Sequence, residues 1–388
     1  MTRSQPATYL ALILALLALS TASAKSDEAG VSDDAILFGQ AAALEGPSAV
    51  LGQRLRQGIV TAFTEINAKG GVHGRRLQLI SRDDGYDPDR SVAQTLRLID
   101  EDKVFALIGA VGTPTAMATI PITSARNVPF IGPFSGAEFL RDLELPNVVN
   151  IRASYDAEAE SFIKHLTEDR GFTRIGIFYQ DDSFGRDVLV SVKRALAMRN
   201  LELAAEGTYE RNTRAVGSAW RMIKRAEPEA VVMVGTYGPC AEFIKLAHRS
   251  GSHPTFANIS FVGATALAGE LGSDGEGVVV AQVVPFPWDR SLKLVSDYQA
   301  AQKALDPTLT PDFVSLEGYL SGRLAASALE KTGPKPTRAS LLRTINDFGR
   351  FDISGSIVTV GVRAIDAPPK VFLTVIQKDG TFKAVDRL

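Results

Sequence analysis

Residues 36–68 read ILFGQAAALEGPSAVLGQRLRQGIVTAFTEINA, and this stretch decides the fold. Its apolar first part, residues 36–44, predicts a buried strand, and its amphipathic second part, residues 51–68, predicts a helix. Between the two, Gly46 is typical of a turn, and we expect Gly46 and Gly52 to let a ligand approach the backbone. A strand followed directly by a helix is the building unit of an α/β protein.

The same alternation of strand and helix recurs along the rest of the chain. We expect further strands at residues 77–81, 105–110, 128–131, 175–179, 230–235 and 259–263. We expect helices at residues 114–126, 184–199, 216–225 and 241–248. This order predicts an α/β fold of doubly wound parallel sheets, in which ligands bind at the carboxyl ends of the strands.

The length of the chain indicates two lobes, because chains tend to divide beyond roughly 250–300 residues and this one has 388. No low-complexity linker separates the lobes, so we expect several strands to cross between them, near Asn150, Pro285 and Arg350. The predicted first lobe comprises residues 33–149 and 285–349. The predicted second lobe comprises residues 150–284 and 350–388.

The start of the chain has the pattern of a cleaved export signal. Arg3 precedes an apolar run at residues 9–19, and Ala22-Ser23-Ala24 forms a small-residue cleavage site. The run is too short to span a bilayer of roughly 30 Å, and no Cys follows the cleavage site to carry a lipid anchor. We therefore expect a signal peptide at residues 1–24 and export to the periplasm. The alternative is an N-terminal helix of the folded domain.

Charge and composition exclude several partners and chemistries. The chain has 42 Lys and Arg against 44 Asp and Glu, which argues against nucleic acid or an anionic membrane as a partner. The single cysteine, Cys240, is expected to be a buried thiol and not a nucleophile. Nucleophile-elbow, phosphate-loop and zinc-protease motifs are absent from the sequence, so we expect no enzyme, no cofactor and no metal.

Two groups of residues have only a partial likeness to metal sites. Asp83, Asp84, Asp87 and Asp89 lack the glycine spacing and the final Glu of a calcium loop, so strand-end and helix-cap roles are expected. His248 and His253 flank a predicted helix end, where capping or solvent contact is expected instead of metal binding.

Several short motifs occur together in an order that is specific to one family. They are ALEGP at 43–47, LG at 51–52, EINAKGGV at 65–72, DD at 83–84, LIG at 107–109, VPFI at 128–131 and DDSFG at 181–185. With these motifs the chain resembles the type I periplasmic solute-binding proteins, in particular the branched-chain amino acid, amide and urea receptors of ABC importers. The resemblance implies two α/β lobes joined by three crossovers, a small-molecule ligand, and an ABC permease in the inner membrane as partner.

The resemblance also implies which residues of the first lobe bind the ligand. The hydroxyl residue that holds a ligand carboxylate in the family aligns with Thr113, whose other interpretation is an ordinary N-cap. The next ligand loop aligns with Phe134, Ser135 and Gly136. Ser135 is the expected second polar contact, whereas Phe134 is either a contact or a core residue. Leu51 stands where the family has an aromatic residue, which makes this wall more apolar.

In the second lobe, the aromatic residue that covers the ligand aligns with Phe184, and a later tyrosine aligns with Tyr237. The carboxylate that grips an α-ammonium in the amino acid receptors aligns with Thr265, which carries no charge. A buried ammonium without a counter-charge is costly, so a standard α-amino acid is not the expected ligand. We expect a small carboxylate or amide-like solute with an apolar or aromatic body. A shift of the alignment would instead bring Glu45 or Glu270 into the site.

The leading functional hypothesis is therefore an exported receptor that closes two lobes over a small molecule and delivers it to an ABC permease. An alternative is a sensory module whose closed form is read by a membrane kinase or chemoreceptor. A neighbouring permease or kinase gene would separate these two hypotheses. A third hypothesis is a secreted enzyme on the same fold, which would require turnover of the ligand.

Overall fold

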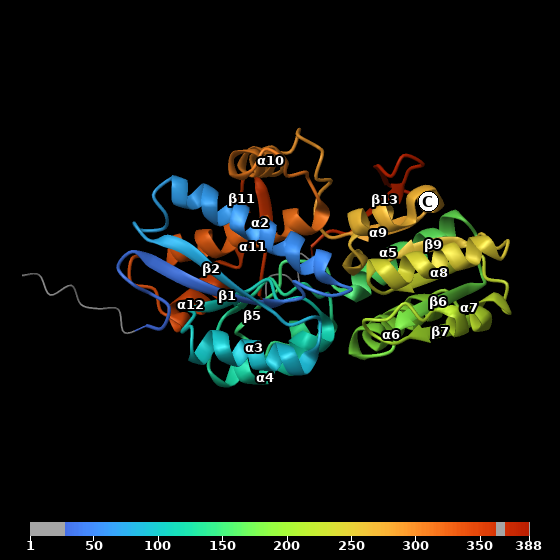
Figure 1. The fold of residues 1–388 in the computed structure, drawn as a ribbon, viewed down its shortest axis with the longest axis horizontal. Helices are drawn as coiled ribbons and strands as arrows, with labels where there is room; N and C mark the ends of the chain where they lie inside the picture. Colours follow the sequence, from blue (N-terminus) through green and yellow to red (C-terminus); the bar gives the residue numbers. More distant parts are fainter. Residues whose placement is uncertain (1–27, 362–368, 388) are drawn as a thin grey trace, which may run out of the picture.

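The described part of the chain forms two α/β lobes that lie side by side along the long axis of the molecule (Figure 1). The computed structural model describes residues 28–361 and 369–387, so the predicted signal peptide at 1–24 lies outside the described residues. Each lobe has its own mainly parallel sheet with helices packed against it, which confirms the predicted fold class.

The first lobe contains a parallel sheet of order β2-β1-β3-β4-β5. Its strands are β1 (Ala35–Ala42), β2 (Arg76–Asp83), β3 (Ala106–Ile108), β4 (Phe130–Ile131) and β5 (Val148–Val149). Its helices are α2 (Ala49–Ala68), α3 (Pro88–Asp100), α4 (Thr113–Ala125), η1 (Glu138–Arg141), α10 (Lys293–Leu305), α11 (Phe313–Thr332) and α12 (Arg338–Phe348). The β3 and β4 strands lie next to each other, so the loops that follow them meet at one edge of the sheet.

The second lobe contains a sheet of order β14-β13-β10-β9-β8-β6-β7, in which β13 and β14 are antiparallel and the other strands parallel. Its strands are β6 (Ile175–Gln180), β7 (Ala205–Tyr209), β8 (Ala230–Val234), β9 (Thr255–Asn258), β10 (Val279–Gln282), β13 (Phe372–Ile376) and β14 (Phe382–Val385). Its helical segments are α5 (Tyr155–Lys164), η2 (His165–Asp169), α6 (Ser183–Ala197), α7 (Gly217–Lys224), α8 (Tyr237–Arg249), η3 (Ser260–Val262), α9 (Ala264–Leu271) and η4 (Gly272–Gly275).

The chain passes from the first sheet to the second after β5 and returns after β10, close to Asn150 and Pro285. The third crossing was expected near Arg350, but the chain does not enter the second sheet there. Strands β11 (Arg350–Ile353) and β12 (Ser356–Thr359) form a separate two-stranded sheet, and β11 packs on α11 of the first lobe. The chain therefore joins the second sheet only at β13, and the other predicted lobe boundaries stay predictions.

Glycines allow two long helices of the first lobe, α2 and α11, to touch backbone to backbone. A Cβ atom on Gly58 would lie 1.9 Å from the carbonyl oxygen of Ser315, and one on Gly318 would lie 2.1 Å from that of Leu55. The same reasoning corrects the expectation for Gly52, whose Cβ would lie 2.0 Å from the carbonyl oxygen of Ala43. Gly52 therefore fits α2 onto the end of β1, and this packing explains the glycine without a ligand.

The predicted strand at residues 259–263 is wrong, because the sheet strand β9 ends at Asn258. The chain then leaves the sheet in the short 3-10 turn η3, and Gly263 adopts the left-handed conformation with φ 76°. The backbone N–H of Ser260 donates to the Glu158 carboxylate, 2.7 Å away, so it is satisfied by a side chain instead of a neighbouring strand. The apolar residues of this segment are buried in a turn, where apolar composition alone cannot distinguish them from a strand.

Four aromatic rings form a cluster where the two lobes join, which we call the hinge cluster: Phe286, Trp288, Phe313 and Phe382. Phe286 and Trp288 belong to the crossing that follows β10, whereas Phe313 begins α11 and Phe382 begins β14. The Trp288 ring lies 5.5 Å from that of Phe313 and 5.7 Å from that of Phe382. The cluster therefore joins an element of the first lobe to a strand of the second.

The acidic residues at the end of β2 and in the following turn bind backbone N–H groups, as expected. Asp83 Oδ1 accepts hydrogen bonds from the backbone N–H groups of Leu44 and Glu45, at 2.8 and 2.9 Å, and so ties the end of β1 to the end of β2. Asp87 accepts from the backbone N–H of Arg90 and caps α3. These carboxylates satisfy backbone groups that would otherwise lack partners.

Candidate functional site

Two predicted ligand residues of the first lobe meet at the carboxyl ends of β3 and β4. The hydroxyl oxygens of Thr113 and Ser135 are 2.7 Å apart, and both side chains are fully buried. Gly112, not Thr113, is the N-cap of α4, so the N-cap interpretation of Thr113 is wrong. The Thr113 hydroxyl instead faces Ser135, and the pair offers two hydroxyls at the sheet edge where ligands of this fold bind.

Tyr155, at the start of α5 in the second lobe, brings a third hydroxyl to this pair. Its phenol oxygen lies 3.4 Å from Thr113 Oγ1, and burial raises the pKa of Tyr155 to about 12, so the phenol stays neutral. A Cβ atom on Gly136 would lie 2.6 Å from Tyr155 Cδ1, which explains why the predicted loop residue is a glycine. The sequence did not single out Tyr155, although its place after the first crossing between lobes could have indicated it.

Buried aromatic rings from both lobes pack beside the hydroxyls. The Phe261 ring lies 4.7 Å from that of Phe184, in its own lobe, and 5.3 Å from that of Phe134, in the first lobe. It also lies 5.9 Å from the ring of Tyr86, and Phe184 contacts Tyr155 at 5.4 Å. The predicted residues Phe134 and Phe184 therefore belong to one aromatic cluster. Its central ring, Phe261, was not predicted as a site residue, because residues 259–263 were expected to form a strand.

The predicted residues Leu51 and Tyr237 come together over Gly263. A Cβ atom on Gly263 would lie 2.5 Å from Leu51 Cδ2 and 3.9 Å from Tyr237 Cδ1. Leu51 is fully buried and belongs to α2 of the first lobe, whereas Tyr237 begins α8 of the second. The two lobes therefore meet closely here, and the glycine leaves room for the leucine side chain.

Thr265 lies in a cavity of about 420 Å³ between the lobes, together with Tyr237. Within the described residues, its hydroxyl is buried without a hydrogen-bond partner, and no hydrogen bond links it to Thr113 or Ser135. The cavity is lined by residues of α2, α8, α9 and the start of α11: Val50, Arg54, Tyr237, Thr265, Ala266, Gly269, Glu270 and Asp312. The structure thus places Thr265 beside Tyr237 but apart from the hydroxyl pair.

Both acids that line this cavity are already engaged. Glu270 accepts two hydrogen bonds from the Arg214 guanidinium, at 3.0 and 2.7 Å, and this pair lowers the pKa of Glu270. Asp312 caps α11 by accepting from the backbone N–H of Ser315. Arg54 adds a positive charge to the same lining. Glu45, the other acid that could have replaced the missing carboxylate, is exposed.

A buried charged network joins the two lobes beneath the aromatic cluster. Arg152 Nη2 lies 3.9 Å from Glu158 on α5, and Arg152 Nε lies 3.6 Å from Glu317 on α11. The guanidinium also stacks on the ring of Phe134, 4.6 Å from its centre, and donates to the hydroxyl of Ser260. Arg152 therefore touches residues of both lobes that support the candidate site.

One arginine cannot neutralise two buried carboxylates equally. Burial raises the pKa of Glu158, and it raises that of Glu317 to about 7. Glu158 accepts hydrogen bonds from the N–H and hydroxyl of Ser260, whereas Glu317 Oε1 lacks a hydrogen-bond partner among the described residues. The hydrogen bonds from Ser260 stabilise the charged form of Glu158, and Glu317 lacks this stabilisation.

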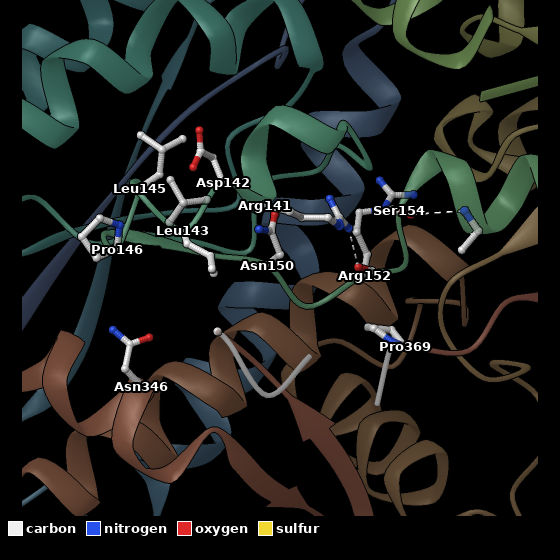
Figure 2. A pocket seen from close by; sticks show the side chains of 13 residues that line it. Arg141, Asp142, Leu143, Leu145, Pro146, Asn150, Arg152, Ser154, Asn346 and Pro369 are labelled. Carbon is white, nitrogen blue, oxygen red and sulfur yellow. Dashed lines mark hydrogen bonds between the residues drawn. The ribbon is translucent and has the colours of Figure 1, made fainter. Parts of the chain in front are cut away.

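A second cavity, of about 430 Å³, lies between the segment that contains β5 and the α12 region (Figure 2). Figure 2 shows Arg141 pointing toward the backbone of Arg152, whose carbonyl oxygen accepts from Arg141 at 2.8 Å. None of the predicted ligand residues lines this cavity. Its edge includes Gly361 and Pro369, on either side of residues outside the described part, and we assign it no function.

The metal, membrane and thiol hypotheses can be compared with the structure of residues 28–361 and 369–387. No three His, Cys, Asp or Glu side chains gather as metal ligands, and no helix there is both long and apolar enough to cross a membrane. The His248 and His253 rings stack at 4.7 Å, and His248 pairs with Asp274. Cys240 is a fully buried free thiol, as predicted, and burial raises its pKa.

Two α/β lobes with chain crossings between them, and with hydroxyls and aromatic rings gathered where the lobes meet, are the features to compare with known proteins. Residues 35–377 match the family described as periplasmic binding protein, and the chain therefore belongs to this family.

Similar proteins agree with this assignment. A solved structure described as a possible leucine/isoleucine/valine-binding protein from Rhodopirellula baltica SH 1 is 38% identical, has a TM-score of 0.85, and is matched over 91% of this chain and 96% of its own. Leu/Ile/Val-binding protein homolog 7 of Brucella abortus is 27% identical over 62% of this chain, and the match spans only 62% of that relative's own length. Leu/Ile/Val-binding protein BraC3 of Rhizobium johnstonii is 24% identical over 84% of this chain and 87% of its own.

Proposed function

We propose that this protein is an exported receptor that closes its two lobes over a small carboxylate or amide-like solute and delivers it, unchanged, to an ABC permease. The observation that carries the proposal is the buried hydroxyl pair of Thr113 and Ser135, 2.7 Å apart, at the junction of the lobes. Hydroxyls donate well to a carboxylate or carbonyl oxygen, and the start of α4 adds the favourable end of a helix dipole.

The rings beside the hydroxyls favour a ligand with an apolar or aromatic body, and the separate Thr265 cavity offers no free carboxylate for an ammonium group. Phe134, Phe184 and Tyr155 supply buried rings beside the hydroxyls. Thr265 carries no charge, and the acids of its cavity already bind Arg214 or cap α11. An ammonium ion placed there would lose its water without gaining a free carboxylate.

The test is a thermal-shift comparison of matched ligand pairs on the protein without residues 1–24. Each pair differs only in the α-amino group: 4-methylpentanoate against leucine, and 3-phenylpropanoate against phenylalanine. A ligand at about 100 times its Kd adds roughly 2.7 kcal/mol to the free energy of unfolding. We expect the acids without an amino group to raise the melting temperature. If the amino acids alone stabilise the protein, the proposed ligand chemistry is wrong.

Delivery to a permease is tested by reconstitution. The loaded receptor should stimulate ATP hydrolysis by its permease in proteoliposomes, and the unloaded receptor should stimulate it less. The ligand recovered by mass spectrometry should be chemically unchanged. Stimulation of a membrane kinase in place of the permease would support the sensory alternative.

A further inference from the structure

Phe261 stands where the two lobes meet, in the η3 turn directly after β9. Its side chain is fully buried, and its ring contacts Phe184 in the second lobe and Phe134 and Tyr86 in the first, at centre distances between 4.7 and 5.9 Å. Rings at these distances are in direct contact. No ligand atom therefore fits between Phe261 and these neighbours.

The backbone that carries Phe261 is fixed by a buried carboxylate. Glu158 accepts from the backbone N–H of Ser260 at 2.7 Å and from its hydroxyl at 2.8 Å. Arg152 donates to the same hydroxyl and also stacks on Phe134, on the opposite wall. Glu158 and Arg152 are thus positioning residues, since they hold two contacting rings of different lobes in one arrangement.

The rings continue directly from the hydroxyl pair. Tyr155 places its phenol oxygen 3.4 Å from Thr113 and its ring 5.4 Å from that of Phe184, which in turn contacts Phe261. For a ligand whose carboxylate is held by Thr113 and Ser135, the nearest buried rings that could contact its body are those of Tyr155 and Phe184, followed by Phe261.

We propose that Phe261 is the specificity-determining residue of the cleft and limits the ligand to carboxylates with a short aliphatic chain or a single ring. This inference rests on the proposed function, because it assumes that the hydroxyl pair holds the carboxylate. Replacing Phe261 by a smaller residue leaves a cavity lined by rings, and such apolar cavities accept molecules as large as benzene.

The experiment measures the Kd of straight-chain carboxylates from propanoate to decanoate, by calorimetry, for the wild-type protein and Phe261→Ala. We expect wild-type affinity to fall sharply beyond a certain chain length and Phe261→Ala to move that limit to longer chains. Each additional buried methylene contributes roughly a fourfold gain in affinity. Octanoate should therefore bind Phe261→Ala at least about tenfold more tightly than it binds the wild type.

Phe256→Ala is the matched control. Phe256 is equally buried in the same lobe, but it packs on Phe243 and His248, away from the other lobe. The control should lose stability without changing the chain-length limit. Phe261→Leu, a smaller truncation, serves if the alanine variant does not fold, and it should move the limit in the same direction.

The outcomes separate this inference from the proposed function. An unchanged limit in Phe261→Ala and Phe261→Leu, or an equal change in Phe256→Ala, overturns the role of Phe261 while the receptor function stands. Straight-chain α-amino acids are measured in parallel. If they bind in place of the carboxylates, the proposed ligand chemistry fails, but their own chain-length limit still tests Phe261. If neither series binds, both proposals are overturned.

Discussion

The two walls of the candidate site differ in chemistry and in how far the sequence revealed them. The first lobe contributes the hydroxyls of Thr113 and Ser135, which lie at the ends of two adjacent parallel strands. The second lobe contributes mainly rings, Phe184 and Phe261 among them, from a helix start and a short turn. The difference suggests a division of labour in which the first lobe binds the polar head and the second covers the body.

A division of this kind has a physical consequence for binding. Hydrogen bonds from Thr113 and Ser135 to the head would come from the first lobe alone and could form before closure, whereas apolar burial requires both lobes to meet. Loss of a hydroxyl should therefore lower the affinity for all ligands alike. Loss of a ring should lower the affinity most for ligands with large bodies.

The largest expected effect comes from breaking the network that holds the two walls together. Arg152→Gln removes the positive charge that pairs with the buried Glu158 and Glu317 carboxyl groups. We expect the free energy of unfolding to fall by about 3–5 kcal/mol, measured by urea denaturation. Arg249→Gln, which breaks an exposed pair with Glu242, is the control and should cost under about 1 kcal/mol. Equal losses in both variants would contradict the role of the network.

A smaller effect is expected from the pH dependence of the same network. The pKa of Glu317 is about 7 in the folded chain against an ordinary 4.5, so between these values the folded chain holds a proton that the unfolded chain has released. The free energy of unfolding should therefore fall as the pH rises from 4.5 to 7, and level off above 7 with respect to this group. Glu317→Gln should lose that part of the decline. If the free energy of unfolding falls equally with pH in the wild type and in Glu317→Gln, Glu317 does not titrate in this range.

Thr113→Val tests the polar wall. The substitution keeps the shape of the side chain and removes its hydroxyl, which a charged ligand head would otherwise use. We expect every carboxylate that binds to lose affinity by about 10- to 100-fold, whatever its body, because hydrogen bonds to charged groups contribute about 1.5–3 kcal/mol. Thr119→Val, on the same helix, is the control, since within the described part of the chain the Thr119 hydroxyl bonds only to backbone carbonyls of α4. A loss that depends on body size would contradict the division of labour.

Phe184→Leu tests the apolar wall and should have the smallest effect. The substitution keeps an apolar side chain but removes the ring contacts with Tyr155 and Phe261. We expect ligands with a ring to lose about three- to tenfold in affinity, in line with the added value of aromatic pairs, and short aliphatic acids to lose less. Calorimetry of benzoate against propanoate measures the difference. A uniform loss for both ligands would place Phe184 outside the body-binding wall.

Local sequence patterns predicted six of the strands, β1, β2, β3, β4, β6 and β8, and five of the helices, α2, α4, α6, α7 and α8, because these elements alternate with clear periodicity. The other described strands and helices were not predicted. The stretch at 36–68 became β1 and α2 with ends shifted by two residues or fewer. The antiparallel additions to the second sheet, β13 and β14, were not predicted, since β13 pairs with β10, more than eighty residues earlier in the chain, and β14 pairs with β13. The position of β11 on α11 is a tertiary contact of the same kind.

The candidate site was predicted less evenly. Family motifs indicated Thr113 and Ser135, and the structure brings them into contact, although their binding of a ligand stays a prediction. Phe261 was missed because an apolar turn and an apolar strand have the same composition, and the interaction that ends β9 comes from Glu158 on a distant helix. A hydrogen bond between residues about a hundred positions apart in the chain leaves no signal in the local sequence.

The hinge cluster contains a tryptophan whose intrinsic fluorescence can report motion of one lobe against the other. The chain has two tryptophans. Trp220 packs on Phe243 inside the second lobe, whereas Trp288 contacts Phe313 of the first lobe and Phe382 of the second. Any rotation of one lobe against the other must change the surroundings of the Trp288 indole while leaving those of Trp220 intact. The intrinsic fluorescence of Trp220→Phe should therefore follow domain motion in real time, in the unlabelled protein, before the natural ligand is known.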